Sequence, residues 1–146
     1  MHIDEAHFRK LERMYHQKAN INVFFQPTLH VSHGAAEIVM PVRREFFHAA
    51  HAVHGSTYFK ALDDAAFFAA NSLVTDVFLL TASYTIYFLR PVTEGTLRGV
   101  GRVVHRSRNL FLAEADLFDS QGHLIGRGSG SFMRSNIALN EDVGYV

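Results

Sequence analysis

The sequence predicts an α+β fold in which one curled antiparallel sheet wraps around a single central helix. Three observations lead to this prediction. Residues 56–73 lack Gly and Pro, are rich in Ala, and carry apolar residues on nearly every side. Two segments of β pattern precede this stretch and four follow it, and short links join the later ones. A helix that is apolar all round is normally enclosed by other elements, and a single helix can be enclosed only by a sheet that curls around it.

The N-terminal part is expected to open on an amphipathic helix over residues 3–17. Its apolar residues recur at helical spacing with charges between them, and Asp4 is the expected N-cap. Apolar residues then alternate between residues 20 and 34, and the alternation resumes after Gly34. This pattern predicts two strands joined by a turn at Gly34.

The second part is expected to hold the central helix and the rest of the sheet. The helix covers residues 56–73, with Ser56 as its N-cap. The four later strands run from Tyr84 up to Arg90-Pro91, from Leu97 to His105, from Leu110 to Phe118 and from His123 to Phe132. Their short links are typical of antiparallel neighbours. Only the tail after about residue 136 is predicted to be loosely held.

This order of elements describes the hotdog fold. The 146 residues fit a single domain, 1–146, since domains most often run to roughly 100 to 150 residues. A single curled sheet leaves edge strands and apolar surface uncovered, and association of copies corrects this. We therefore expect a homo-oligomer, either a homodimer or a homotetramer built as a dimer of dimers.

The composition argues against several classes of function. Lys plus Arg and Asp plus Glu number 14 each, so no net charge draws the chain to nucleic acid or to an anionic membrane. The absence of Cys rules out disulfides, a thiolate nucleophile and Cys-ligated zinc. The charged N-terminus lacks the apolar core of a secretory signal, and polar residues interrupt the longest apolar stretch. A cytoplasmic protein with no nucleic-acid or membrane partner is expected.

Three of the ten His residues, His48, His51 and His54, recur at a three-residue step directly before the central helix. Glu45 extends the same step. On a helix this step would present three imidazoles and a carboxylate on one side, which is a metal-site pattern. The next helix begins directly afterwards, however, so residues 46–54 are expected to form a loop with divergent side chains. We therefore expect no metal, and assign the imidazoles to loop hydrogen bonds or to substrate binding and catalysis.

Asp63 and Asp64 are neighbours on the enclosed helix, where their side chains point about 100° apart. At least one needs a special environment, because a buried carboxylate without a partner is costly and its pKa tends to rise. One interpretation pairs Asp64 with a basic residue and hydrogen-bonds Asp63 to backbone or hydroxyl groups. The other interpretation makes Asp63 catalytic.

His54-Gly55-Ser56, followed by Leu62-Asp63-Asp64-Ala65, resembles the HGG...AD.A motif of hotdog-fold acyl-CoA thioesterases of the phenylacetate-pathway type. The resemblance covers roughly residues 35–134. It implies hydrolysis of an acyl-CoA thioester to free acid and CoA, with no cofactor besides the CoA of the substrate. Asp63 would be the nucleophile or the base that activates water. The Gly55 N–H would polarise the carbonyl, a role that suits the free N–H groups of a helix N-terminus.

The resemblance adds further candidate residues. In the family the acid and the N–H donor come from opposite subunits, His54 belongs to the motif, and Thr81 falls where a Ser or Thr orients the attacking water. We expect Arg106, Arg108 and Arg127 to hold the phosphates and adenosine of CoA, because guanidinium gives planar, multi-donor contacts to phosphate. The alternative is that these three Arg are solvated residues at strand ends.

The chain departs from the family pattern at three positions. His48 stands where the family has Asn, His51 where it has Gly, and Ser56 where it has the second Gly of HGG. We place His51 and Ser56 with the substrate-binding residues, and His48 with the catalytic ones, either as a donor in place of the Asn amide or as a general acid or base. Two alternatives stay open: a hotdog enoyl-CoA hydratase or dehydratase that uses His48 and Asp63, and a non-catalytic acyl-CoA-binding protein.

The nature of the acyl group is left open by the sequence. Phe67, Phe68, Phe78 and Phe88 line an aryl or aliphatic pocket in one interpretation, and belong to the ordinary core in the other, which we favour.

Overall fold

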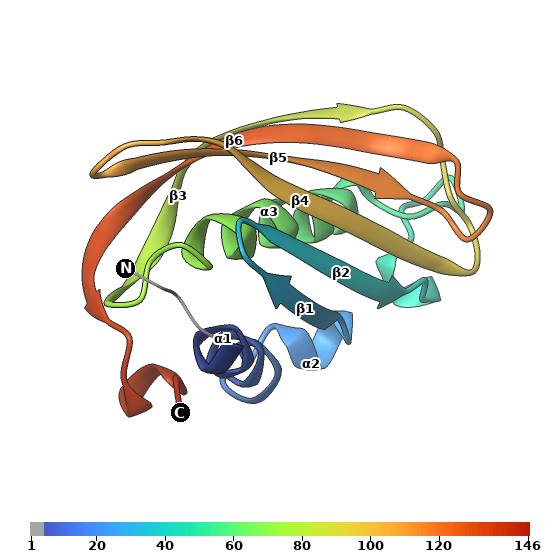
Figure 1. Cartoon of the computed structure of the whole chain (residues 1–146). Coiled ribbons are helices and arrows are strands. Elements are labelled where there is room, and N and C mark those ends of the chain that lie inside the picture. The colour runs from blue at the N-terminus through green and yellow to red at the C-terminus, as the bar shows by residue number, and fades with distance from the viewer. Residues whose placement is uncertain (1–4) are drawn as a thin grey trace.

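The computed structural model describes residues 5–146, in which a six-stranded antiparallel sheet curls around one long helix (Figure 1). The elements in chain order are α1 (Glu5–Gln17), α2 (Asn22–Phe25), β1 (Thr28–Ser32), β2 (Ala35–Pro41), η1 (Arg44–Phe46), α3 (Gly55–Asn71), β3 (Val77–Phe88), β4 (Thr96–Arg106), β5 (Leu110–Phe118), β6 (Leu124–Ala138) and η2 (Glu141–Val143). The strand order across the sheet is β1-β2-β4-β5-β6-β3. The hotdog fold predicted from the sequence is confirmed.

The central helix α3 lies close to the sheet because both surfaces carry small residues. Ala61 and Ala65 of α3 are fully buried. On β4, a Cβ atom at Gly101 would lie 2.2 Å from the carbonyl oxygen of Ala65, and one at Gly99 would lie 3.0 Å from that of Ala61. Only glycine fits at the tighter of these two contacts. The close approach lets the sheet bend around the helix and enclose it.

The strand β3 forms one edge of the sheet, because β6 is its only neighbour in the strand order. It is 12 residues long, and it and the residue after it expose large apolar side chains, among them Leu80, Tyr87, Phe88 and Leu89. Long apolar edges are templates for pairing with another strand. Within residues 5–146, nothing pairs with the outer side of this edge.

The prediction of a strand between residues 20 and 34 is wrong for the first half of this segment. Residues 22–25 form the short helix α2, and only Thr28–Ser32 form a strand. The side chain of Asn22 donates a hydrogen bond to the carbonyl of Tyr15 at the end of α1, at 2.8 Å, and Gln26 closes the turn with a left-handed φ of 56°. This side-chain contact competes with the strand, which the apolar alternation alone favoured. The expected cap Asp4 lies outside the described residues.

The expectation of a loosely held tail after about residue 136 is corrected by the structure. β6 continues to Ala138, and the residues after it pack against α1, beside the C-terminus in Figure 1. Tyr145 donates a hydrogen bond to Nδ1 of His7 at 2.7 Å, since Nε2 of that ring donates to the Asn71 carbonyl. Arg13 donates to the carbonyl of Val146 at 2.8 Å. These contacts join residues far apart in sequence, so no local pattern predicted them.

No helix within residues 5–146 is both long enough and apolar enough to cross a membrane.

Candidate functional site

Asp63 lies on α3 at the wall of a mainly apolar cavity of about 460 Å³. Its Oδ1 accepts a hydrogen bond from the Thr81 hydroxyl of β3 at 2.9 Å. The cavity is lined by residues of α1, α3, β3 and η2 and by residues next to them: Met14, Tyr15, Lys18, Ala19, Lys60, Asp63, Asp64, Phe67, Phe68, Phe78, Leu79, Leu80, Thr81, Asp142 and Val143. The structure therefore brings together Asp63 and Thr81, the two residues for which the family resemblance implies a role toward the attacking water.

The pKa of Asp63 is raised to about 6, mainly by burial and, to a smaller extent, by the nearby charge of Asp64. The hydrogen bond from Thr81 and the charge of Lys60 act in the opposite direction. A carboxylate with a pKa near the working pH is present in its ionised form at neutral pH and is still a better base than an ordinary Asp. The environment of Asp63 therefore suits a nucleophile or a general base.

Asp64, unlike Asp63, is engaged by two polar partners. Its Oδ2 accepts hydrogen bonds from the Tyr15 hydroxyl at 2.6 Å and from Lys60 Nζ at 2.7 Å. Lys60 also lies over the rings of Tyr15 and Phe25, at 5.2 and 5.7 Å from their centroids. The interpretation that pairs Asp64 with a basic residue agrees with the structure.

The N-terminus of α3 forms the second part of the site. His54, and not the expected Ser56, is the N-cap: its Nδ1 accepts the Ser56 N–H at 2.9 Å and lies 2.9 Å from the Ser56 hydroxyl. Gly55 is the first helical residue, so its N–H has no intrahelical acceptor. A Cβ atom at Gly55 would lie 2.8 Å from the Phe88 ring. The absence of a side chain at Gly55 therefore lets the Phe88 ring lie against the N-terminus of α3.

A second pocket, of about 380 Å³, lies at the N-terminus of α3. It is lined by His48, Val53, Gly55, Tyr58, Phe88, Leu89, Arg90 and Pro91. His48 accepts the Ala50 N–H on Nδ1 at 3.1 Å, so the neutral ring carries its proton on Nε2 and presents a donor. Phe88 is 56% exposed, so it is a pocket residue and not the core residue that we favoured from the sequence.

His51 is exposed and takes a left-handed φ of 66°. This conformation is one that glycine adopts freely, which explains why the resembling family has Gly at the position. Within the described part of the chain, no three His, Cys, Asp or Glu side chains, including those of His48, His51 and His54, are grouped so that they could hold an ion.

The three Arg expected at CoA are not gathered near either pocket of this chain. Arg127 donates to Asp116 at 2.7 Å on the exposed surface of β6. Arg106 is the last residue of β4, and Arg108 lies in the turn between β4 and β5, at the opposite end of the molecule from the start of α3 (Figure 1). Arg106 and Arg108 are exposed. A role toward CoA stays a prediction.

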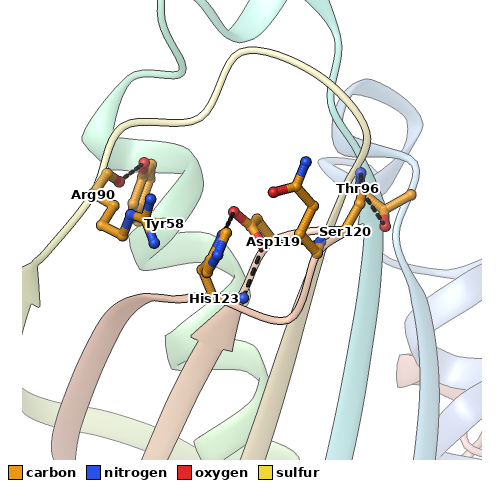
Figure 2. A network of polar contacts seen from close by, with 7 residues as sticks. Tyr58, Arg90, Thr96, Asp119, Ser120 and His123 are labelled. Atoms are coloured by element: carbon orange, nitrogen blue, oxygen red, sulfur yellow. Dashed lines mark hydrogen bonds and ion pairs between the residues drawn. The ribbon is translucent and has the colours of Figure 1, made fainter.

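A network of polar contacts fixes the loops beside the second pocket (Figure 2). The Tyr58 hydroxyl donates to the Arg90 carbonyl at 2.6 Å, which ties the end of β3 to α3. Asp119 accepts the N–H of His123 at 2.9 Å and lies 3.1 Å from its ring nitrogen, and Ser120 accepts the Thr96 N–H at 2.7 Å. The sequence analysis did not identify Tyr58, whose only signal is its place one turn after Gly55.

Comparisons with known proteins identify the family of this chain. Residues 50–125, more than half of the chain, match the Thioesterase superfamily. The chain is 22% identical over 129 residues to a Saccharolobus solfataricus protein whose name proposes an esterase, covering 88% of this chain and 92% of that protein.

Solved structures are similar as well. The PaaI protein of E. coli, from the phenylacetic acid degradation operon, is 20% identical, with a TM-score of 0.83 over 94% of this chain and 99% of that one. A conserved protein of Pseudomonas aeruginosa is 24% identical, with a TM-score of 0.76 over 80% and 94%. At these identities the structures show a shared fold. The resemblance predicted from the sequence is confirmed for the superfamily and the fold, and the chain belongs to the thioesterase superfamily.

Proposed function

We propose that the protein is an acyl-CoA thioesterase that hydrolyses its substrate to a free acid and CoA. Membership of the superfamily supports a hydrolase of thioesters or esters. One observation carries the finer proposal: a carboxylate of raised pKa, Asp63, and an open helix N-terminal N–H, Gly55, lie on the same helix and each lines a pocket.

The spacing of these two groups supports a site shared between two copies of the chain. Asp63 follows Gly55 by eight residues, which is about 12 Å along a helix at 1.5 Å per residue. The group that attacks a carbonyl carbon and the donor that binds its oxygen each need to lie within about 3 to 3.5 Å of those atoms. One chain therefore cannot supply both groups to one thioester.

The exposed edge of β3 offers the route to a homodimer. Thr81 lies beside Asp63, and Phe88 lies against Gly55, so β3 carries both halves of the site along its length. If two β3 strands pair antiparallel about a point between Tyr84 and Thr85, Thr81 of one protomer lies opposite Phe88 of its partner. This register brings Asp63 of one protomer toward Gly55 of its partner, and it buries the apolar edge.

In the proposed reaction the thioester carbonyl lies between the two subunits. Asp63 either attacks the carbonyl carbon, which gives an acid anhydride that water then hydrolyses, or removes a proton from the water that attacks. Thr81 holds the carboxylate and the water in place. The partner's Gly55 N–H and His48 Nε2–H stabilise the negative charge on the carbonyl oxygen. Collapse of the tetrahedral intermediate breaks the carbon–sulfur bond, and the CoA thiolate takes up a proton.

Two substitutions at Gly55 test this proposal together with Asp63→Ala. Asp63→Ala is expected to lose most of kcat while circular dichroism shows that the fold is kept. Gly55→Pro removes the N–H at a helix position where proline is favoured, and the extended ψ of 146° at His54 suits a following proline. It is expected to lower kcat by roughly 10²- to 10³-fold.

Gly55→Ala is the matched control, because it places the same Cβ atom against the Phe88 ring as proline does, but keeps the N–H. It is expected to retain far more of kcat than Gly55→Pro. Unchanged turnover in Asp63→Ala would exclude the mechanism. Hydration of an enoyl-CoA by the wild type would support the hydratase or dehydratase instead. Tight binding of acyl-CoA with no turnover would support the non-catalytic binding protein.

A further inference from the structure

Residues near the N-terminus and near the C-terminus of the described chain both line the cavity beside Asp63. Met14, Lys18 and Ala19 contribute from α1 and the residues that follow it, and Asp142 and Val143 contribute from η2. We infer that this cavity binds the acyl group of the substrate, that this group is a long apolar chain, and that Val143 sets its length limit. The inference rests on the proposed function and adds the substrate class to it.

The lining of the cavity suits an acyl chain and not the other arm of an acyl-CoA. Most lining residues are apolar, with Phe67, Phe78 and Leu80 next to the reactive carboxylate. Of the polar ones, Asp64 is paired with Lys60 and Tyr15, and Asp63 with Thr81. Lys18 and Asp142 are the other charged residues of the lining. The pantetheine arm of CoA carries two amide groups, and an amide without a hydrogen-bond partner in an apolar site costs several kcal/mol, on the order of 2 to 7. A hydrocarbon chain has no such groups.

The volume of the cavity indicates how long the acyl chain can be. A volume of about 460 Å³ holds roughly fifteen groups of the size of water, at about 30 Å³ each. A methylene group is of similar size, so the space suits a chain on the order of ten to fourteen carbons. An acetyl or butyryl group would leave most of an apolar cavity unfilled, and would gain little from binding there.

The wall that carries Val143 is fixed in place from both sides. Tyr145 is hydrogen-bonded to His7, and its ring lies under Lys10, at 5.2 Å. A Cβ atom at Gly144, whose φ is 84°, would lie 2.7 Å from the Lys18 side chain, so the tail runs directly against α1. α1 in turn is held to α3 by the hydrogen bond from Tyr15 to Asp64. The distance between the wall and Asp63 is therefore determined by the fold.

The experiment compares Val143→Phe with Val146→Phe, the same change at an exposed residue that does not line the cavity. For each protein, kcat/KM is measured with straight-chain acyl-CoAs from two to sixteen carbons, and Kd is measured by calorimetry with S-alkyl-CoA thioethers, which cannot be hydrolysed. Val143→Ala is measured as well, so that the result does not depend on how the larger side chain is tolerated.

In the wild type, kcat/KM and affinity are expected to rise with chain length up to a limit. Val143→Phe is expected to lower both by about 10-fold or more for the longest chains, since each lost methylene contact in an apolar pocket is worth roughly 10-fold, and to leave butyryl-CoA within about twofold. Val143→Ala is expected to move the limit to longer chains. Val146→Phe is expected to match the wild type.

Two results would overturn the inference: a wild type that prefers acetyl-CoA or butyryl-CoA, and a length profile that is the same in Val143→Phe, Val143→Ala and Val146→Phe. The thioethers separate this inference from the proposed function. Length-dependent binding that changes in Val143→Phe, with no turnover by the wild type, would support the acyl site and refute the thioesterase.

Discussion

Replacing Asp63 by Asn is expected to abolish hydrolysis and to make the protein more stable at neutral pH. Folding raises the pKa of Asp63 from its usual 3.8 to about 6, mainly through burial. The folded chain therefore binds this proton more tightly than the unfolded chain does, and ionisation lowers the free energy of unfolding. Asn is the neutral isostere of the protonated carboxyl, and its amide oxygen can still accept the hydrogen bond from Thr81.

The magnitude follows from the two pKa values. At 1.36 kcal/mol per pKa unit, the ionised carboxyl lowers the free energy of unfolding by about 3 kcal/mol. Because the folded pKa is raised, this loss is complete above about pH 7, shrinks as the pH falls through 6, and disappears below 3.8. Asp63→Asn should therefore exceed the wild type by about 3 kcal/mol at pH 7.5 and by only about 1 kcal/mol at pH 4.5.

Urea denaturation at these two pH values, at one protein concentration, measures the difference. Asp76→Asn is the control: Arg134 holds the pKa of Asp76 below its usual value, so its replacement should not stabilise the protein. An Asp63→Asn variant that is no more stable than the wild type at pH 7.5, or whose advantage does not shrink at pH 4.5, would show that Asp63 is not a destabilised, ionised group.

Three further predictions concern the same site. In the wild type kcat/KM should fall below about pH 6, and Asp64→Asn, which removes a neighbouring negative charge, should move this fall to lower pH while keeping much of the activity; an unmoved pH profile would contradict the coupling. His48→Asn should keep much of kcat if His48 only donates a hydrogen bond, whereas a loss of roughly 10²- to 10⁴-fold, with loss of an ionisation near neutrality, would make it a general acid or base. Chelators should leave activity unchanged, and about one zinc ion per chain, lost with His48 or His51, would instead indicate a metal-dependent hydrolase.

The parts of the fold set by local periodicity could be predicted from the sequence. The apolar, Ala-rich stretch predicted α3, because a helix repeats its inward-facing positions at a fixed interval. Period-2 alternation predicted the strands after it in the same way, except that β3 begins at Val77 and not at the expected Tyr84. The pairing of Asp63 with Thr81 was expected from the resemblance to a family, and the structure places the two side chains 2.9 Å apart.

The residues that shape the cavity could not be predicted in this way. Tyr15 reaches Asp64 across 49 positions of the sequence, and Tyr145 reaches His7 across 138. Such contacts depend on how the helices and strands pack against each other, and no regular spacing in the sequence predicts them. Lys60 is the exception, because its place four residues before Asp64 is a spacing at which helix side chains meet.

The central claim is that one active site takes Asp63 from one subunit and Gly55 from its partner. Mixed dimers of Asp63→Ala and Gly55→Pro chains test it most directly, because each mixed dimer has one site with both groups intact and one site with neither. Each variant alone should be nearly inactive. After the two are unfolded together and refolded in equal amounts, half of the dimers are mixed, so hydrolysis of a long-chain acyl-CoA should return to about a quarter of the wild-type rate. A mixture that stays as inactive as the separate variants would contradict the claim.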